Sequence, residues 1–214
     1  MDDSEREFFQ NARHPKGDDG RKLLERMNGG SHARLAEWAF SLCRPSATDW
    51  ALDIGCGGGA NLKRLLSFCS EGNVIGVDHA KTSVEMSREL CVEEREAERC
   101  SIMPGTAQRL PIVDGCLDFV CAFETVYFWG NLDRAFAEVK RVLAPGGTFL
   151  IANEVDGTHD DDFEMVDVIK GMQVLTPYQI GTHLARVGFI LDSTEHKSGE
   201  HWVAFISHLP AEQD

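Results

Sequence analysis

The glycine-rich segment LDIGCGGGA at residues 52–60 is the part of the sequence best suited to bind a ligand. An apolar run precedes the glycines and a helical pattern follows them, so the backbone can approach a ligand where side chains would block it. The spacing Gly55-x-Gly57-x-x-Ala60 also satisfies the loose dinucleotide fingerprint, in which a helix N-terminus faces a pyrophosphate. The segment therefore predicts a nucleotide site and leaves the kind of nucleotide open.

Two carboxylates near these glycines narrow the choice of ligand. Asp53 stands directly before them, where a negative charge would repel a pyrophosphate but attract a cationic ammonium group. Asp78 ends the next apolar run, where an acidic residue can accept hydrogen bonds from ribose hydroxyls, as it would equally for NAD. Together the two residues predict a nucleoside that carries positive charge.

Residues further along the chain are candidates for handling a second substrate. Tyr127 and Trp129 follow a later apolar run and could form an aromatic wall or hold a cation, although packing under the next helix explains them equally well. His32 is a candidate base, with a capping or surface role favoured. The run His159-Asp-Asp-Asp162 has the composition of a metal site, but contiguous side chains point in different directions. We therefore expect an exposed acidic loop there and no metal site.

The elements that position these residues alternate between strands and helices. The alternation predicts an α/β fold with a doubly wound, mostly parallel sheet. The last two strands have only a turn between them, so at least one should be antiparallel. Strands are expected at 50–55, 74–78, 101–103, 117–123, 148–153, 190–195 and 202–207, with a turn at 145–147. Helices are expected at 61–68, from a capping box at 82–85 towards residue 99, at 132–143, and from 176–177 to Gly188.

The first 49 residues lie outside this alternation. Ser31 is expected to cap a helix that carries Leu35, Trp38, Ala39 and Leu42 on one face. Residues 1–49 are therefore interpreted as an N-terminal helical extension, and residues 50–214 as the main domain.

Composition limits the class of partner and compartment. The 214 residues carry 21 basic and 35 acidic side chains, for a net charge of −14, which disfavours binding to a nucleic acid. No apolar stretch reaches the roughly 18–20 residues of a membrane helix, and the acidic opening is unlike a secretory signal. The seven cysteines have no disulfide or zinc spacing, so we expect reduced thiols in the cytoplasm.

Four motifs in order resemble those of the class I S-adenosylmethionine-dependent methyltransferases. They are DIGCGGG, the Asp that closes the second strand, GTAQRLP and VLAPGGTFLI, and they cover residues 50–154. The likeness is greatest to the small-molecule branch that includes the ubiquinone/menaquinone-type and type 11 enzymes. This resemblance implies a seven-stranded sheet in which the last inserted strand is antiparallel.

The resemblance also implies roles for individual residues. Thr106 departs from the Asp that many relatives have, so a bond to the adenine amino group would be weaker here. The N-terminal stretch resembles a helical lid over the cofactor. By this resemblance, Asp53 would orient the methionine part of S-adenosylmethionine, Gly55, Cys56 and Gly57 would line that part, and Glu124 would lie near its amino-acid end. Asp78 would hold the ribose. His79 would lie beside the adenine, and Thr106, Ala107 and Gln108 would meet the adenine edge.

The function implied is methyl transfer to a small molecule by in-line displacement. Because the sulfonium donor is already activated, the enzyme mainly aligns the reactants and excludes water, so no catalytic triad is expected. An NAD-linked oxidoreductase is the first alternative, but neither a substrate domain nor a Tyr-x-x-x-Lys motif is evident. A non-catalytic S-adenosylmethionine-binding protein is the second, and a protein or RNA methyltransferase is less favoured. A monomer or a homodimer is expected.

Overall fold

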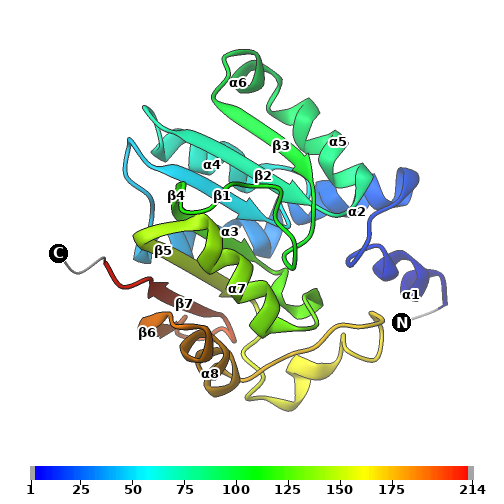
Figure 1. The fold of residues 1–214 in the computed structure, drawn as a ribbon. Coiled ribbons are helices and arrows are strands. Elements are labelled where there is room, and N and C mark those ends of the chain that lie inside the picture. Colours follow the sequence, from blue (N-terminus) through cyan, green and yellow to red (C-terminus); the bar gives the residue numbers. More distant parts are fainter. Residues whose placement is uncertain (1–2, 212–214) are drawn as a thin grey trace.

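The computed structural model describes residues 3–211, which form a seven-stranded sheet between helices (Figure 1). The strand order is β3-β2-β1-β4-β5-β7-β6, and β7 runs opposite to the others. Both the doubly wound α/β fold and the antiparallel inserted strand are therefore as predicted. The strands are β1 Trp50–Ile54, β2 Asn73–Asp78, β3 Cys100–Pro104, β4 Leu117–Phe123, β5 Leu143–Asn153, β6 Ile190–His196 and β7 Val203–His208.

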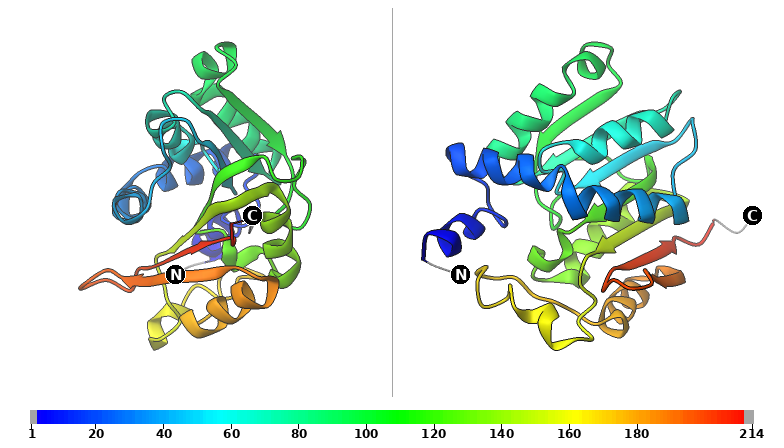
Figure 2. Two further views of the ribbon diagram at one scale, coloured as in Figure 1. Left: turned by 60° about the vertical axis from the view of Figure 1, so that its left-hand side comes forward. Right: turned by 180° about the vertical axis from the view of Figure 1, so that it is seen from behind.

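Helices cover both faces of the sheet. Figure 2 shows α3, α4 and α5 on one face, while α7 and α8 lie on the other. The long helices are α1 Asp3–Gln10, α2 Gly17–Met27, α3 Gly30–Leu42, α4 Ala60–Phe68, α5 Lys81–Leu90, α7 Leu132–Val142 and α8 Pro177–Val187. The shorter ones are α6 Val92–Glu96 and the 3₁₀ turns η1 Val126–Phe128 and η2 Asp160–Phe163.

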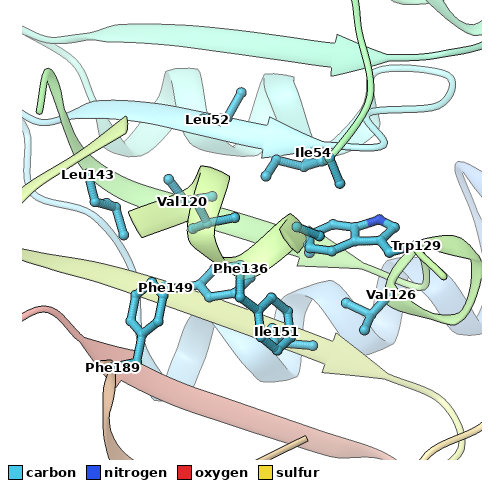
Figure 3. Close-up of a cluster of buried hydrophobic side chains, with 14 of the residues drawn as sticks. Leu52, Ile54, Val120, Val126, Trp129, Phe136, Leu143, Phe149, Ile151 and Phe189 are labelled. Carbon is cyan, nitrogen blue, oxygen red and sulfur yellow. The ribbon is translucent and has the colours of Figure 1, made fainter. Parts of the chain in front are cut away.

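Each face of the sheet has its own apolar core. Beneath α7, Phe149 of β5 stacks parallel to Trp129 and packs edge-on against Phe136 (Figure 3). On the opposite face, Leu35 of α3 and Leu62 of α4 are fully buried. A fully buried side chain of this size stabilises the fold by about 1.5–3 kcal/mol. Because α3 shares the core of the main domain, the N-terminal extension is packed on the sheet rather than separate from it.

The N-terminal helices also contact the segment that follows η2. In Figure 1, α1 lies beside the segment that follows η2. Gln10 and Arg13 donate hydrogen bonds to the backbone carbonyls of Val168 and Lys170, respectively. These contacts connect the N-terminal helices to the segment between η2 and α8.

Several predicted boundaries were wrong. The helix expected from Thr82 towards residue 99 begins at Lys81 without a side-chain cap and leaves helical geometry at Cys91, whose side chain turns into the core. The helix expected to start with Ser31 as cap has Gly29 in that position. Strand β5 begins at Leu143, before the expected turn, because Leu143 pairs with Leu117 across a register shift.

The start of α8 follows the prediction closely. Thr176 caps the helix in a reciprocal box with Gln179, Pro177 is its first residue, and Gly188 ends it with a φ of 97°. Among the described residues, no helix is both long and apolar enough to cross a membrane. All seven cysteines are free, and five of them are buried.

Candidate active site

A cavity of about 280 Å³ lies at the carboxyl ends of β1, β2 and β4. The N-terminal helices α2 and α3 form its opposite wall. Eleven residues that the sequence pointed to line it: His32, Gly55, Cys56, Gly57, Asp78, His79, Thr106, Ala107, Gln108, Glu124 and Trp129. Asp53 and Tyr127 do not.

The loop between β1 and α4 brings backbone to the cavity. Gly55, Gly57 and Gly59 all have positive φ values, at 80°, 54° and 88°, which side-chain-bearing residues rarely adopt. A Cβ added to Gly55 would lie 2.3 Å from Cγ2 of Thr125. The loop is fastened to β2, since the Gly55 amide donates to the Val77 carbonyl at 2.7 Å. Gly55 is therefore required by both conformation and close packing, and Gly57 and Gly59 are favoured by conformation.

Asp78 fixes the end of β2 beside this loop. One carboxylate oxygen accepts a hydrogen bond from the Gly57 amide at 3.0 Å, and the other accepts from the Ala80 amide at 2.8 Å. The residue is buried, yet it lines the cavity. A carboxylate can accept about four hydrogen bonds, so each oxygen keeps a lone pair for a ligand. Asp78 can thus organise the loop and bind a hydroxyl pair at once.

Asp53 lies beneath the cavity rather than on its wall. Its carboxylate is 2% exposed and accepts a hydrogen bond from the Cys121 thiol at 3.7 Å. Burial raises the pKa of Asp53 to about 7, and the nearby charge of Asp78 adds to this rise. A positive charge above it would favour the ionised form.

The side of the cavity assigned to the adenine is formed by the loop after β3. Thr106 and Arg109 pair across a tight turn, and the Gln108 amide donates to the carbonyl of Trp129. The ring of His79 lies 4.8 Å from that of His14, which comes from the segment before α2. The N-terminal extension thus contacts the cofactor side of the cavity directly.

Two further lining residues, His32 and Glu124, lie close to Glu154, which does not itself line the cavity. His32 Nε2 lies 3.6 Å from a carboxylate oxygen of Glu154 and 4.0 Å from one of Glu124. Burial raises the pKa of Glu124 to about 8, and repulsion by Glu154 contributes. The pKa of His32 is lowered by burial, against the attraction of Glu154, and Arg26 lowers it further. Burial thus favours the neutral imidazole of His32, which can accept a proton or coordinate an ion.

The two aromatic candidates differ in position. Tyr127 is buried, and its hydroxyl donates to Glu124 at 3.0 Å and accepts from the Val155 amide at 3.3 Å. Trp129 packs in the core but borders the cavity with part of its surface. In this conformation Tyr127 positions Glu124 rather than facing a substrate.

The sequence predicted an exposed acidic loop at residues 159–162, but one of its aspartates is buried. Asp162 is 2% exposed and accepts hydrogen bonds from the Thr158 amide and from His201, the latter at 2.7 Å. The His201 ring stacks on that of His159 with centroids 4.0 Å apart. The group formed by His159, Asp162 and His201 therefore connects the η2 segment to the β6–β7 hairpin.

Two residues of the site were not singled out from the sequence. Thr125 donates to the carbonyl of Ile54 at 3.1 Å, and Glu154 adjoins Glu124. Glu154 directly follows β5, so its place at the carboxyl edge of the sheet was a usable signal. Asn28, which belongs to the N-terminal stretch that resembles a lid, donates to the carbonyl of Gly58 at 3.2 Å.

Known proteins share this fold and these motifs. Residues 52–151 match the type 11 family model described as a methyltransferase domain. The chain is 30% identical over 158 residues to the sterol 4-C-methyltransferase strm-1 of Caenorhabditis elegans, covering 73% of this chain and 45% of that protein. It is 37% identical over 107 residues to the malonyl-[acyl-carrier protein] O-methyltransferase of Geobacter sulfurreducens, covering 50% and 39%. The chain therefore spans less than half the length of either relative.

The fold has counterparts among solved structures. A S-adenosylmethionine-dependent methyltransferase from Aquifex aeolicus superposes with a TM-score of 0.72, at 16% identity, over 88% of this chain and 97% of that one. Together with the family match, this likeness identifies the centre of the chain as a methyltransferase domain with the class I fold. The family predicted from the four motifs is thereby confirmed.

Proposed function

We propose that the protein transfers the methyl group of S-adenosylmethionine to a small-molecule acceptor. The observation that carries this proposal is the arrangement around Asp78: a buried carboxylate and a glycine loop share one edge of a cavity at the carboxyl ends of the strands. In doubly wound folds, nucleoside ligands bind at this edge. The methyltransferase domain at residues 52–151 supports the same reading.

The roles proposed for the cavity residues follow from their places. Asp78 would hold the ribose, the loop at Gly55 and Gly57 would lie against the methionine part, and Asp53 would stabilise its positive charge from below. His79 and the segment 106–108 would surround the adenine. Cys56 and Glu124 complete the set that borders the donor. The lining contributed by α2 and α3 supports a role for the N-terminal extension as a cover that excludes water.

Methyl transfer is a displacement in which the acceptor lone pair forms a bond to the methyl carbon as the carbon–sulfur bond breaks. The donor needs no further activation, so alignment supplies most of the rate enhancement. A base is needed only when the acceptor is a hydroxyl or a similar acid. His32 is the base that we propose for that case, and Trp129 the aromatic wall. Tyr127 would act through Glu124.

The remaining assignments belong to the same proposal. The net charge of −14 favours an uncharged or cationic small molecule over a nucleic acid. Reduced cysteines favour the cytoplasm as its location. A monomer or homodimer would suffice, because every residue proposed for the cofactor comes from one chain.

Ligand-dependent thermal stability separates this function from its alternatives. A ligand stabilises only the fold that it binds, so S-adenosylhomocysteine should raise the melting temperature and NADH should not. Greater stabilisation by NADH would instead identify a dinucleotide-linked oxidoreductase. The melting temperature of a non-catalytic binding protein would also rise with S-adenosylhomocysteine. Such a protein would form no S-adenosylhomocysteine from S-adenosylmethionine with any acceptor in a broad screen of metabolites.

A further inference from the structure

Three side chains with metal-binding chemistry converge from separate elements, and two of them, His32 and Glu124, line the cavity. His32 belongs to α3, Glu124 follows β4 and Glu154 follows β5. One ligand atom from each lies within 4.8 Å of the others, and His32 Nε2 is 3.6 Å and 4.0 Å from the two carboxylates. Ligand atoms about 2.1 Å from a shared ion lie about 3.0–3.4 Å apart. To complete the site, His32 Nε2 and each carboxylate must approach by about 0.2–1.0 Å, and the widest pair of ligand atoms, at most 4.8 Å apart, by up to about 1.8 Å.

Neighbouring groups already orient one of these ligands. Oε1 of Glu124 accepts hydrogen bonds from the Tyr127 hydroxyl and from the Glu154 amide. The other oxygen, Oε2, is the one that faces His32. Hydrogen bonds of this kind from an outer shell fix the direction of metal-bound carboxylates. The arrangement leaves one oxygen of Glu124 held and one free to coordinate.

The second glutamate lacks a partner that its burial demands. Oε1 of Glu154 is inaccessible to solvent and has no hydrogen-bond partner among residues 3–211, and the same holds for the side-chain oxygen of Asn153 beside it. Buried acceptors are nearly always satisfied, because an unsatisfied one costs about 1–3 kcal/mol. The oxygen of Glu154 that faces His32 is Oε2, so an ion held by both oxygens of this carboxylate would satisfy Oε1 as well.

No lysine or arginine that the structure describes competes with an ion for this group. Within the described part of the chain, neither glutamate forms a salt bridge with a lysine or arginine, and His32 is their shared partner. The carboxylate oxygens that face His32 are therefore open to coordinate an ion.

We propose that His32, Glu124 and Glu154 bind a divalent transition-metal ion whose open positions take an oxygen atom of the methyl acceptor. This inference rests on the proposed methyl transfer and names its substrate class, a small molecule with a hydroxyl or enol group. Imidazole with carboxylates suits ions such as Mn²⁺ and Zn²⁺. His32 would then bind the ion instead of acting as the base, so the ion-bound hydroxyl releases its proton to solvent, and its oxygen forms the bond to the methyl carbon. The carbon–sulfur electron pair returns to sulfur, which leaves a neutral thioether.

Titration of the chelator-treated full-length protein with Mn²⁺ tests the site without any turnover. We expect about one ion per chain, measured from the free Mn²⁺ signal in electron paramagnetic resonance. Glu154→Gln and His32→Asn should weaken binding by about tenfold or more. His201→Asn is the matched control, because it removes a ligand from the separate His159–Asp162–His201 group. Melting curves in chelator verify that each variant is folded.

The outcomes separate this inference from the proposed function. Absence of saturable Mn²⁺ binding would overturn the metal site, as would binding lost in His201→Asn but retained in Glu154→Gln. Mutual exclusion of Mn²⁺ and S-adenosylhomocysteine would also overturn it, because the group would then bind the ammonium of the cofactor. A metal-free protein that still binds S-adenosylhomocysteine leaves the proposed function standing by itself.

Discussion

At the scale of single residues, Asp78 is the most informative side chain of the cavity, because it both holds the glycine loop and lines the cavity. We expect Asp78→Ala to weaken S-adenosylhomocysteine binding by about 1–3 kcal/mol, the range for hydrogen bonds to a charged group. Isothermal titration calorimetry measures the change, and exposed Asp167→Ala is the matched control. Unchanged affinity in Asp78→Ala would contradict the ribose assignment.

Asp53 should make cofactor binding depend on pH. Its pKa is raised to about 7 by burial, so the free protein holds a proton there at pH 6 that a cationic ligand must displace. If Asp53 is fully ionised in the complex, the cost of removing its proton makes the affinity for S-adenosylmethionine about tenfold lower at pH 6 than at pH 8. Calorimetry in buffers of different ionisation enthalpy would detect the released proton. Asp53→Asn should flatten this dependence, and an unaltered slope would remove Asp53 from the binding site.

At the scale of elements, the β6–β7 hairpin is joined to η2 by a histidine–aspartate contact. Pairing with Asp162 raises the pKa of His201 above its usual value, and the stacked ring of His159 covers one face. The stabilisation is therefore complete below the unfolded-state pKa near 6.5 and is lost as the pH rises through the folded-state pKa. The charged groups around His201 are Asp156, Asp161, Asp162 and His159.

Because the His201–Asp162 contact stabilises the protein more at low pH, a variant that lacks the contact should lose more stability there. We expect His201→Asn to lower the free energy of unfolding more at pH 5.5 than at pH 8.5. Urea unfolding at both pH values, with wild type in parallel, measures the difference. An effect of equal size at both pH values would mean that the contact acts through packing rather than charge.

At the scale of the whole molecule, the cavity lies between the sheet and the N-terminal helices. Residues of α2 and α3 line it, and Asn28 bonds to the glycine loop. Ligand binding should therefore stabilise both walls together. We expect S-adenosylhomocysteine to slow amide hydrogen exchange in residues 13–35 as well as in 53–60. Helix α8 lies on the other face of the sheet and serves as the internal control (Figure 2). Slowing restricted to residues 53–60 would refute a covering role for the extension.

Local sequence patterns were sufficient to predict the sheet and most of the cofactor side of the cavity. Residues at the ends of parallel strands meet at one edge whatever the details of packing, which is why Gly55, Asp78 and Glu124 were placed correctly beside the cavity. Exact helix limits were predicted less well, because Cys91 ends α5 to reach the core rather than for any local signal.

Thus the sequence by itself determined the strand–helix alternation, the antiparallel hairpin and the glycine loop, since each depends on neighbouring residues and their backbone preferences. Only the tertiary structure decided that His32 meets Glu124 and Glu154, and that His201 bonds to the buried Asp162. These residues lie far apart in the chain, and their distances depend on how α3, β4, β5 and the hairpin pack together. Local patterns do not contain that packing, because it results from the shape of two buried cores.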